Sequence, residues 1–345
     1  MSTPASPGGV GPASLDGATP SSPIGESPST GPASLSAAPA SQSAAPAARP
    51  SSVSIWWHAA RPNTLPAALA GVIVGLGVGY GVGAPFRLDT AIGCVLVALL
   101  LQVLANFAND LSDFRKGADT AARQGPMRVA AAGLVSERQL EVAIGITIAA
   151  AGVVGLWLAY IGGPVLIALG VLAVVAALAY TGGPWPYGYR GLGEVFVFLF
   201  FGLVAVVGTA YLQAGRLEPV FFAAAVPVGA LTTAILVVNN LRDIPTDTVA
   251  GKRTIAVMIG EGATQGEWLV LVAAAFATPI ALALAGWSWL LLATLVAIPL
   301  AVPLWATVRG FTERRQLNLV LKGTARLSLV VALLFAIGLA LGPRG

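Results

Sequence analysis

Long apolar runs dominate this chain and leave it few possible folds. Of its 345 residues, 56% are hydrophobic and only 10% are charged, whereas a soluble domain carries roughly 25% charge. Within a bilayer, only helices and closed barrels satisfy their own backbone hydrogen bonds, and a helix needs about twenty residues to cross it. The sequence therefore predicts an all-α, polytopic membrane protein. The alternative, a large soluble α/β enzyme, would have shorter apolar runs that are more often broken by charge.

We expect an N-terminal tail followed by nine transmembrane helices. Residues 1–52 are mainly Ser, Ala, Pro and Gly, a composition that buries too little apolar surface to fold, so we expect this tail to be disordered and dispensable. Residues 53–345 form the membrane domain, which begins at an interfacial Ile55-Trp56-Trp57-His58 because tryptophan favours the headgroup level. The nine predicted spans are 64–83, 89–111, 139–160, 164–181, 193–213, 219–240, 267–286, 288–308 and 323–342.

Basic residues are distributed unevenly over the loops between these runs. If the N-terminus is cytoplasmic, sixteen Lys and Arg residues lie inside, and only Arg87, Arg216 and Arg344 lie outside. The positive-inside rule therefore favours a cytoplasmic N-terminus and a C-terminus outside. The net charge of +4 does not indicate binding to nucleic acid, because the basic residues cluster at the ends of apolar runs.

The rarest residue types exclude several classes of site. Cys94 is the single cysteine, so it can form no internal disulfide, and its apolar surroundings favour a packing role. His58 is the single histidine, which excludes a histidine-based metal site and a Ser-His triad. Glycines at 71, 75, 79 and 83 superficially resemble a nucleotide-binding loop, but no strand–turn–helix context surrounds them. Small residues at this spacing favour close packing of transmembrane helices.

Two polar stretches stand out, one after the second apolar run and one after the sixth. Ionisable groups at membrane depth cost several kcal/mol and mark functional sites. Asp110 and Asp113 are spaced i, i+3 and share a helix face. Asp243 and Asp247 are spaced i, i+4 and share a face if the helix continues, but we expect Pro245 to disturb that turn. Neither Asp110 nor Asp243 has an obvious structural partner in the sequence.

These carboxylate pairs would repel each other unless positive charge lay between them. Oxygen ligands suit Mg²⁺, which takes one or two carboxylates together with substrate phosphates. Arg binds phosphate bidentately, and Lys supplies a point charge. The basic residues of the two stretches are Lys116, Arg123, Arg128, Lys252 and Arg253. Because the pattern occurs twice, a Mg²⁺–diphosphate site is favoured over salt bridges on a solvated surface.

The motifs resemble the UbiA superfamily of intramembrane aromatic prenyltransferases over about residues 55–342. Six segments point to the branch that prenylates 1,4-dihydroxy-2-naphthoate in menaquinone synthesis. They are Arg61-Pro-Asn-Thr-Leu-Pro, Asn109-Asp-x-x-Asp-x-x-Lys-Gly-x-Asp119-Thr, Arg123-x-Gly-Pro-x-Arg128, Tyr180-Thr-Gly-Gly-Pro, Tyr189-Arg-Gly-Leu-Gly-Glu194 and Asn239-Asn-x-Arg-Asp-x-x-x-Asp-x-x-x-Gly-Lys-Arg-Thr. One position departs from the wider superfamily, where a third Asp usually stands at the place of Gly117. This departure leaves the metal role of Asp119 less well defined than that of Asp113.

The resemblance implies helices around a central cavity, capped by the two Asp-bearing loops on the cytoplasmic side of a bacterial inner membrane. It implies Mg²⁺-dependent prenyl transfer from polyprenyl diphosphate to 1,4-dihydroxy-2-naphthoate, with loss of diphosphate and CO₂, giving demethylmenaquinol. The metal would act as Lewis acid and template. The alternative acceptors are a hydroxybenzoate, homogentisate or chlorophyllide. The alternative class is a transporter, whose acidic site would lie near mid-membrane.

The resemblance also assigns roles to individual residues. The expected catalytic carboxylates are Asp110, Asp113, Asp243 and Asp247, and these would bind the metal with Asn109 and Asp119. The expected substrate-binding residues are Asn63, Asn106, Lys116, Arg123, Arg128, Tyr180, Tyr189, Arg190, Glu194, Asn239, Arg242, Lys252 and Arg253. Among them, Tyr180, Tyr189, Arg190 and Glu194 form an expected third polar cluster, which would either position the acceptor or cap helices.

Overall fold

The computed structural model describes residues 51–117 and 128–342, and within these ranges the chain is helical without a strand. Eight helical stretches there are long and apolar enough to cross a membrane. A further apolar helix, α5 (Val165–Ala179), has only 15 residues. At 1.5 Å per residue it extends about 22 Å, less than the roughly 30 Å of hydrocarbon. The expected all-α polytopic fold is confirmed, and the nine expected spans correspond to eight long stretches and one short one.

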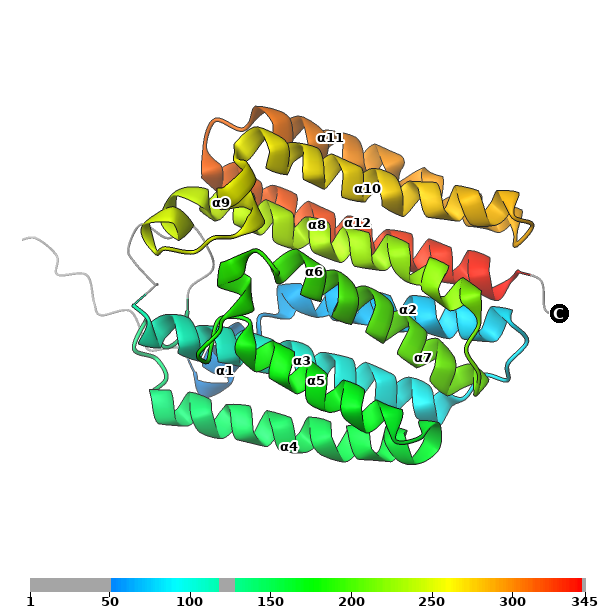
Figure 1. The fold of residues 1–345 in the computed structure, drawn as a ribbon, viewed down its shortest axis with the longest axis horizontal. Helices are drawn as coiled ribbons and strands as arrows, with labels where there is room; N and C mark the ends of the chain where they lie inside the picture. Colours follow the sequence, from blue (N-terminus) through cyan, green and yellow to red (C-terminus); the bar gives the residue numbers. More distant parts are fainter. Residues whose placement is uncertain (1–50, 118–127, 343–345) are drawn as a thin grey trace, which may run out of the picture. The chain divides into compact units, whose positions relative to one another are not determined.

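Figure 1 shows the long helices lying side by side. The first part of the domain contains α1 (Ser52–Ala60), η1 (Pro62–Thr64), α2 (Leu65–Gly81), α3 (Leu88–Arg115), α4 (Glu137–Gly162) and α5. A short turn, η2 (Tyr187–Arg190), leads into one continuous stretch made of α6 (Gly193–Val197), the π-helical η3 (Phe198–Val204) and α7 (Ala205–Ala214). The last part contains α8 (Pro219–Val249), α9 (Ile255–Ile259), α10 (Glu261–Leu284), η4 (Trp289–Ala297), α11 (Ile298–Gly310), η5 (Arg314–Gln316) and α12 (Leu317–Ala340).

Helix α2 packs closely against both α7 and α12 through its glycines. A Cβ added at Gly75 would lie 2.6 Å from the Cβ of Thr209 in α7. A Cβ added at Gly77 would lie 2.5 Å from the carbonyl oxygen of Ala336 in α12. The interpretation of the glycine repeat as a helix-packing feature is therefore confirmed.

Helix α8 runs without interruption through Pro245 to Val249, so the expected disturbance of this turn is wrong. Proline lacks the N–H that would bond to the carbonyl four residues earlier, here that of Leu241. The Leu241 carbonyl instead accepts a hydrogen bond from Arg314 Nη1 at 2.7 Å. This replacement donor lets the helix continue and places Asp243 and Asp247 one turn apart.

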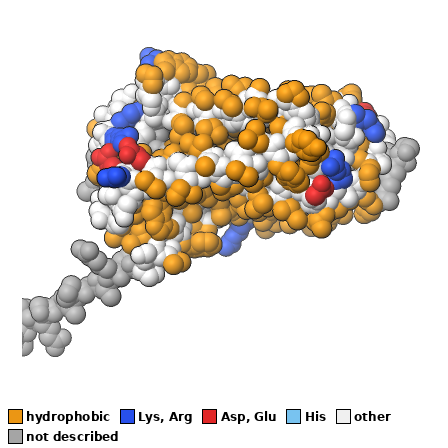
Figure 2. Space-filling view, turned by 90° about the horizontal axis from the view of Figure 1, so that it is seen from below, with side chains coloured by type: hydrophobic (Ala, Val, Ile, Leu, Met, Phe, Trp, Pro, Cys, Tyr) orange, Lys and Arg blue, Asp and Glu red, His pale blue; other side chains and the backbone are white. Residues whose placement is uncertain are grey.

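The outer surface is largely apolar between its ends. Figure 2 shows hydrophobic side chains over the middle of one face, with most of the charged groups towards its two ends. In α1, Trp56 contacts Phe107 with ring centroids 5.7 Å apart and Trp57 is exposed, and the interfacial position expected for them stays a prediction. Residues 1–50 lie outside the described ranges, so the predicted disordered tail stays a prediction. Ser52, placed in that tail, already begins α1.

Candidate active site

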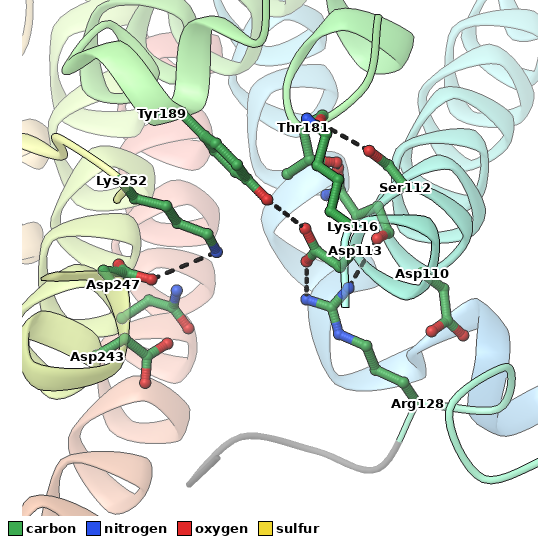
Figure 3. A network of polar contacts seen from close by, with 12 residues as sticks. Asp110, Ser112, Asp113, Lys116, Arg128, Thr181, Tyr189, Asp243, Asp247 and Lys252 are labelled. Carbon is green, nitrogen blue, oxygen red and sulfur yellow. Dashed lines mark hydrogen bonds and ion pairs between the residues drawn. The ribbon is translucent and has the colours of Figure 1, made fainter. Parts of the chain in front are cut away.

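Asp113, near the end of α3, is buried and held by two residues distant in sequence. Its Oδ1 accepts a hydrogen bond from the Tyr189 hydroxyl at 2.8 Å. Its Oδ2 forms an ion pair with the Arg128 guanidinium, whose Nη1 also donates to the Asn109 carbonyl at 2.7 Å. Figure 3 shows these side chains converging from three segments of the chain. The carboxylate is therefore fixed by tertiary contacts rather than by its own helix.

Asp110, one turn earlier, joins α3 to the segment after the undescribed residues. It is 2% exposed, and its Oδ2 accepts a hydrogen bond from the backbone N–H of Val129 at 3.1 Å. The expectation that Asp110 lacks a structural partner is therefore wrong. This contact could not be predicted from the sequence, because the donor is a backbone N–H, which the identity of the residue does not reveal.

The two asparagines of the first motif have different partners. Asn109 accepts a hydrogen bond from Thr181 Oγ1 at 2.9 Å, which ties α3 to the loop after α5. Asn106 donates to the Ala60 carbonyl at 2.8 Å and to Thr64 Oγ1 at 3.0 Å, which ties α3 to the end of α1 and to η1. Asn63 lies exposed in η1, and its neighbour Thr64 makes the contact to α3. Asn106 thus orients helices in this structure.

Thr181 was not singled out in the sequence, although it follows Tyr180 in a quoted motif. Its carbonyl accepts hydrogen bonds from Ser112 Oγ at 2.7 Å and from Lys116 Nζ. The Tyr180-Thr-Gly-Gly-Pro segment was the available signal. These contacts hold the Lys116 ammonium beside the first carboxylate pair.

In the second motif, Arg242 is buried and lies at the centre of the contacts. It donates to both oxygens of Asp243, at 2.7 and 2.6 Å. It also donates to the side-chain oxygens of Asn239 at 2.9 Å and Asn318 at 2.7 Å. Asp243 therefore has a structural partner, contrary to expectation. Asn318 was missed because it is a single asparagine on α12 with no motif around it.

Asp247 is paired through a short turn that follows α8. Its carboxylate lies 3.3 Å from Lys252 Nζ, and its carbonyl accepts the Lys252 backbone N–H at 2.8 Å. Gly251 makes this return possible with φ of +70°, a left-handed conformation that favours glycine. Arg253 has an exposed side chain and is anchored through its backbone N–H to the Tyr189 carbonyl at 2.9 Å.

Tyr189 joins the two halves of the site. Its hydroxyl contacts Asp113, while Lys116 Nζ and Lys252 Nζ lie 4.5 and 4.7 Å from its ring centroid. Such distances allow cation–π attraction, which lets both ammonium groups approach one ring. Burial, and next the charge of Asp113, raise the pKa of Tyr189, so the hydroxyl stays a donor. Burial lowers the pKa of Lys116, although Asp113 opposes this shift.

The expected third polar cluster is dispersed in the structure. Glu194 is buried and accepts a hydrogen bond from Asn240 Nδ2 at 2.7 Å. Arg190 is exposed and lies over the Trp185 ring at 5.1 Å. Tyr180 packs against the start of α6, where a Cβ added at Gly193 would lie 3.5 Å from the Tyr180 hydroxyl oxygen. Of the four expected members, only Tyr189 contacts a motif carboxylate.

An apolar cavity begins beside the two motifs. It has a volume of about 400 Å³. Asn106, Asn109 and Asn239 line it, as does Tyr180, while the other lining residues are mostly Ala, Val, Leu, Phe and Gly. A polar mouth and an apolar interior are suited to a ligand with a charged head and a hydrocarbon body.

The carboxylates fit a metal that is shared with a substrate. Within residues 51–117 and 128–342, no three His, Cys, Asp or Glu side chains group closely enough to enclose a metal ion. The four motif carboxylates instead form two pairs, and Mg²⁺ commonly takes one or two carboxylates plus substrate phosphates. Asp119 and Arg123 lie outside the described residues, so their expected roles stay predictions.

Comparison with known proteins identifies the family. The UbiA prenyltransferase family model matches residues 68–322. The 1,4-dihydroxy-2-naphthoate octaprenyltransferase of Mycobacterium tuberculosis is 42% identical, over 85% of this chain and 99% of its own length. The Escherichia coli protein of that name is 35% identical, over 84% and 96%. A UbiA homolog from Archaeoglobus fulgidus, solved with GPP and Mg²⁺, has a TM-score of 0.58 at 17% identity, covering 82% of this chain and 99% of that one. The chain is therefore a member of the UbiA prenyltransferase family.

Proposed function

We propose that this protein transfers a polyprenyl group from polyprenyl diphosphate to 1,4-dihydroxy-2-naphthoate, with loss of diphosphate and CO₂, giving demethylmenaquinol. The observation that carries the proposal is that one carboxylate of each motif meets Tyr189 beside an apolar cavity: Asp113 contacts its hydroxyl, and Asp247 pairs with Lys252, which lies over its ring together with Lys116. The naphthoate acceptor is supported by relatives of up to 42% identity that carry this activity in their names.

The diphosphate would bind between the two motifs. Arg128 and Lys252 now neutralise Asp113 and Asp247, and Lys116 lies beside them. Asp110, Asp113, Asp243 and Asp247 would hold Mg²⁺, which would supply Lewis-acid stabilisation of the leaving diphosphate. Arg128 and Lys252 would then exchange their carboxylate contacts for phosphate oxygens, and Lys116, which now donates to the Thr181 carbonyl, would add a third cation. The archaeal homolog was solved with GPP and Mg²⁺ bound, which supports a prenyl diphosphate and Mg²⁺ as the ligands of this fold.

The apolar cavity would hold the isoprenoid and exclude water from the allylic cation formed as the C–O bond breaks. The electron-rich naphthoate ring then attacks that carbon, and its carboxylate leaves as CO₂. Tyr180 and Asn239 line the cavity near the motifs, where they would contact the ring. Four other expected substrate-binding residues make no contact in this structure that depends on a bound acceptor, so their substrate-binding roles stay part of the proposal. They are Asn63, Arg190, Glu194 and Arg253.

The protein would lie in a bacterial inner membrane with its N-terminus and site on the cytoplasmic side and its C-terminus outside. The distribution of basic residues supports this orientation, with sixteen inside and three outside. Cysteine-labelling of substituted loop positions in intact cells would test it. Labelling at position 216 but not at position 252 is expected.

The activity is tested with purified protein, a polyprenyl diphosphate and each candidate acceptor in turn. Prenylated product should form with 1,4-dihydroxy-2-naphthoate, and EDTA should abolish it until Mg²⁺ is restored. Product with hydroxybenzoate or homogentisate in its place would transfer the proposal to that acceptor. A transport current without Mg²⁺-dependent release of diphosphate would overturn it.

A further inference from the structure

A groove separate from the apolar cavity lies where α1, α3 and the first turns of α4 meet. It has a volume of about 690 Å³ and shares no described lining residue with the cavity. Trp56 of α1 and Phe107 of α3 line it, and the other lining residues all belong to the range 136–147 at the start of α4. None of the four motif carboxylates lines it, so the groove is not part of the diphosphate site.

The α4 side of the groove is polar at one end and apolar at the other. Arg138, Val142 and Ile146 are spaced four residues apart, so they form a stripe about 12 Å long on one face of the helix. Ser136 and Gln139 accompany Arg138 at the polar end. Val142 is 54% exposed and Ile146 is 65% exposed. The stripe therefore leads from hydrogen-bonding groups to exposed apolar side chains, which suits an amphipathic ligand.

The polar end of the groove lies at the carboxylate end of the bundle. Arg115, two residues after Asp113, donates through Nε to Glu137 at 2.8 Å and through Nη2 to Glu141. These contacts hold the first turns of α4 beside the end of α3. Because the apolar span of α3 ends at Arg115, the polar end of the groove lies towards the headgroups and the apolar end towards the hydrocarbon.

Arg138 supplies a positive charge that is not neutralised within the described part of the chain. Its side chain is exposed, and no residue in 51–117 or 128–342 forms a hydrogen bond or ion pair with its guanidinium. The neighbouring acids Glu137 and Glu141 are instead bound to Arg115. A guanidinium binds phosphate bidentately. The groove thus combines a group that can bind phosphate with an apolar surface directly below it.

We propose that this groove binds one phospholipid with a net negative headgroup, whose phosphate contacts Arg138 and whose acyl chain lies along Val142 and Ile146. This lipid differs from the general lipid layer around the bundle because side chains from three helices surround it. Charge selects the headgroup, since a zwitterionic lipid would bring a second cation close to Arg138. The proposal does not depend on the prenyl-transfer reaction.

The test measures lipid adducts of the purified full chain in detergent by native mass spectrometry. Titration gives an apparent Kd for dioleoyl phosphatidylglycerol and for dioleoyl phosphatidylcholine. The wild type should bind phosphatidylglycerol at least about fivefold more tightly, the effect of one basic residue at an anionic lipid surface. Arg138→Gln should abolish this preference. Equal Kd values for the two lipids in the wild type, or an unchanged preference in the variant, would overturn the proposal.

Arg309→Gln is the matched control for charge. Arg309 lies in the last turn of α11, is exposed, has no partner for its guanidinium among the described residues, and does not line the groove. This variant should keep the full preference for phosphatidylglycerol. If Arg309→Gln lost the preference as Arg138→Gln does, the preference would reflect general surface charge, and the groove would not be a lipid site.

Val142→Trp tests the apolar half of the groove. The larger side chain fills the space for the acyl chain, so phosphatidylglycerol should bind at least about tenfold more weakly. Val153→Trp places the same side chain at a 71% exposed position of α4 outside the groove and should bind as the wild type does. Equal weakening in both variants would overturn the proposal. So would a wild-type dimer that Val142→Trp dissociates without changing lipid binding, because the occupant would then be a second copy of the chain.

Discussion

The two Asp-bearing motifs reach similar chemistry by different structural means. In the first, Asp113 is held by Arg128 and by Tyr189, residues 15 and 76 positions away. In the second, Asp243 is held by its neighbour Arg242, and Asp247 by Lys252 after one turn. The carboxylates of the second half therefore have partners close in sequence, whereas Asp113 is held by partners from distant segments. This difference predicts where a substitution affects activity and where it affects folding.

The largest expected effect comes from removing a carboxylate in either half. Asp113→Ala and Asp243→Ala should each lower turnover at least about 100-fold, because in the proposed function both halves serve one metal–diphosphate site worth several kcal/mol. Turnover would be measured with matched amounts of folded protein in detergent. If both variants kept more than a tenth of the activity, the idea of one shared site would be wrong.

Arg242 should matter most for stability. Arg242→Met leaves Asp243 without its partner at a nearly buried position and should lower stability by about 3–5 kcal/mol. Arg314→Met is the control. It removes the hydrogen-bond donor to the Leu241 carbonyl, and because the Arg314 side chain is more exposed, the free energy of unfolding should fall by about 1 kcal/mol. Thermal unfolding in detergent compares them. Equal losses would contradict the distinction between these two arginines.

Tyr189→Phe probes the connection between the halves. The variant keeps the ring between Lys116 and Lys252 but removes the hydrogen bond to Asp113. A bond to a charged group contributes about 1.5–3 kcal/mol, so turnover should fall at least about tenfold. Tyr189→Leu, which also removes the ring, should be worse. Identical activities for the two variants would show that the ring contributes nothing.

The smallest effect is expected at the edge of the site. Arg190 is exposed, and its guanidinium lies 5.1 Å from the centroid of the Trp185 ring. Arg190→Ala should therefore change the kcat and the KM for the donor by less than about twofold, as for an ordinary surface substitution. A tenfold rise in KM for either substrate would instead place Arg190 in the binding site.

The helices and the two polar stretches could be predicted from the sequence, but the contacts between their side chains could not. The apolar runs predicted the helices, and the glycine repeat of α2 predicted close packing. The course of α8 through Pro245 was not predictable, because the donor that replaces the missing N–H is Arg314, 69 residues further along the chain. Thr181 and Asn318 were missed for a related reason, since nothing next to them in sequence indicates their partners.

The sequence by itself determined that this chain is a bundle of membrane helices and that its polar chemistry lies in two stretches. Burying so many apolar residues in helices leaves no comparable alternative in a bilayer. Only the tertiary structure decided that the two stretches meet at Tyr189 and that Glu194 and Arg190 lie in separate surroundings. These features depend on how helices pack, and the periodicity of one helix does not specify the side chains that its neighbours present.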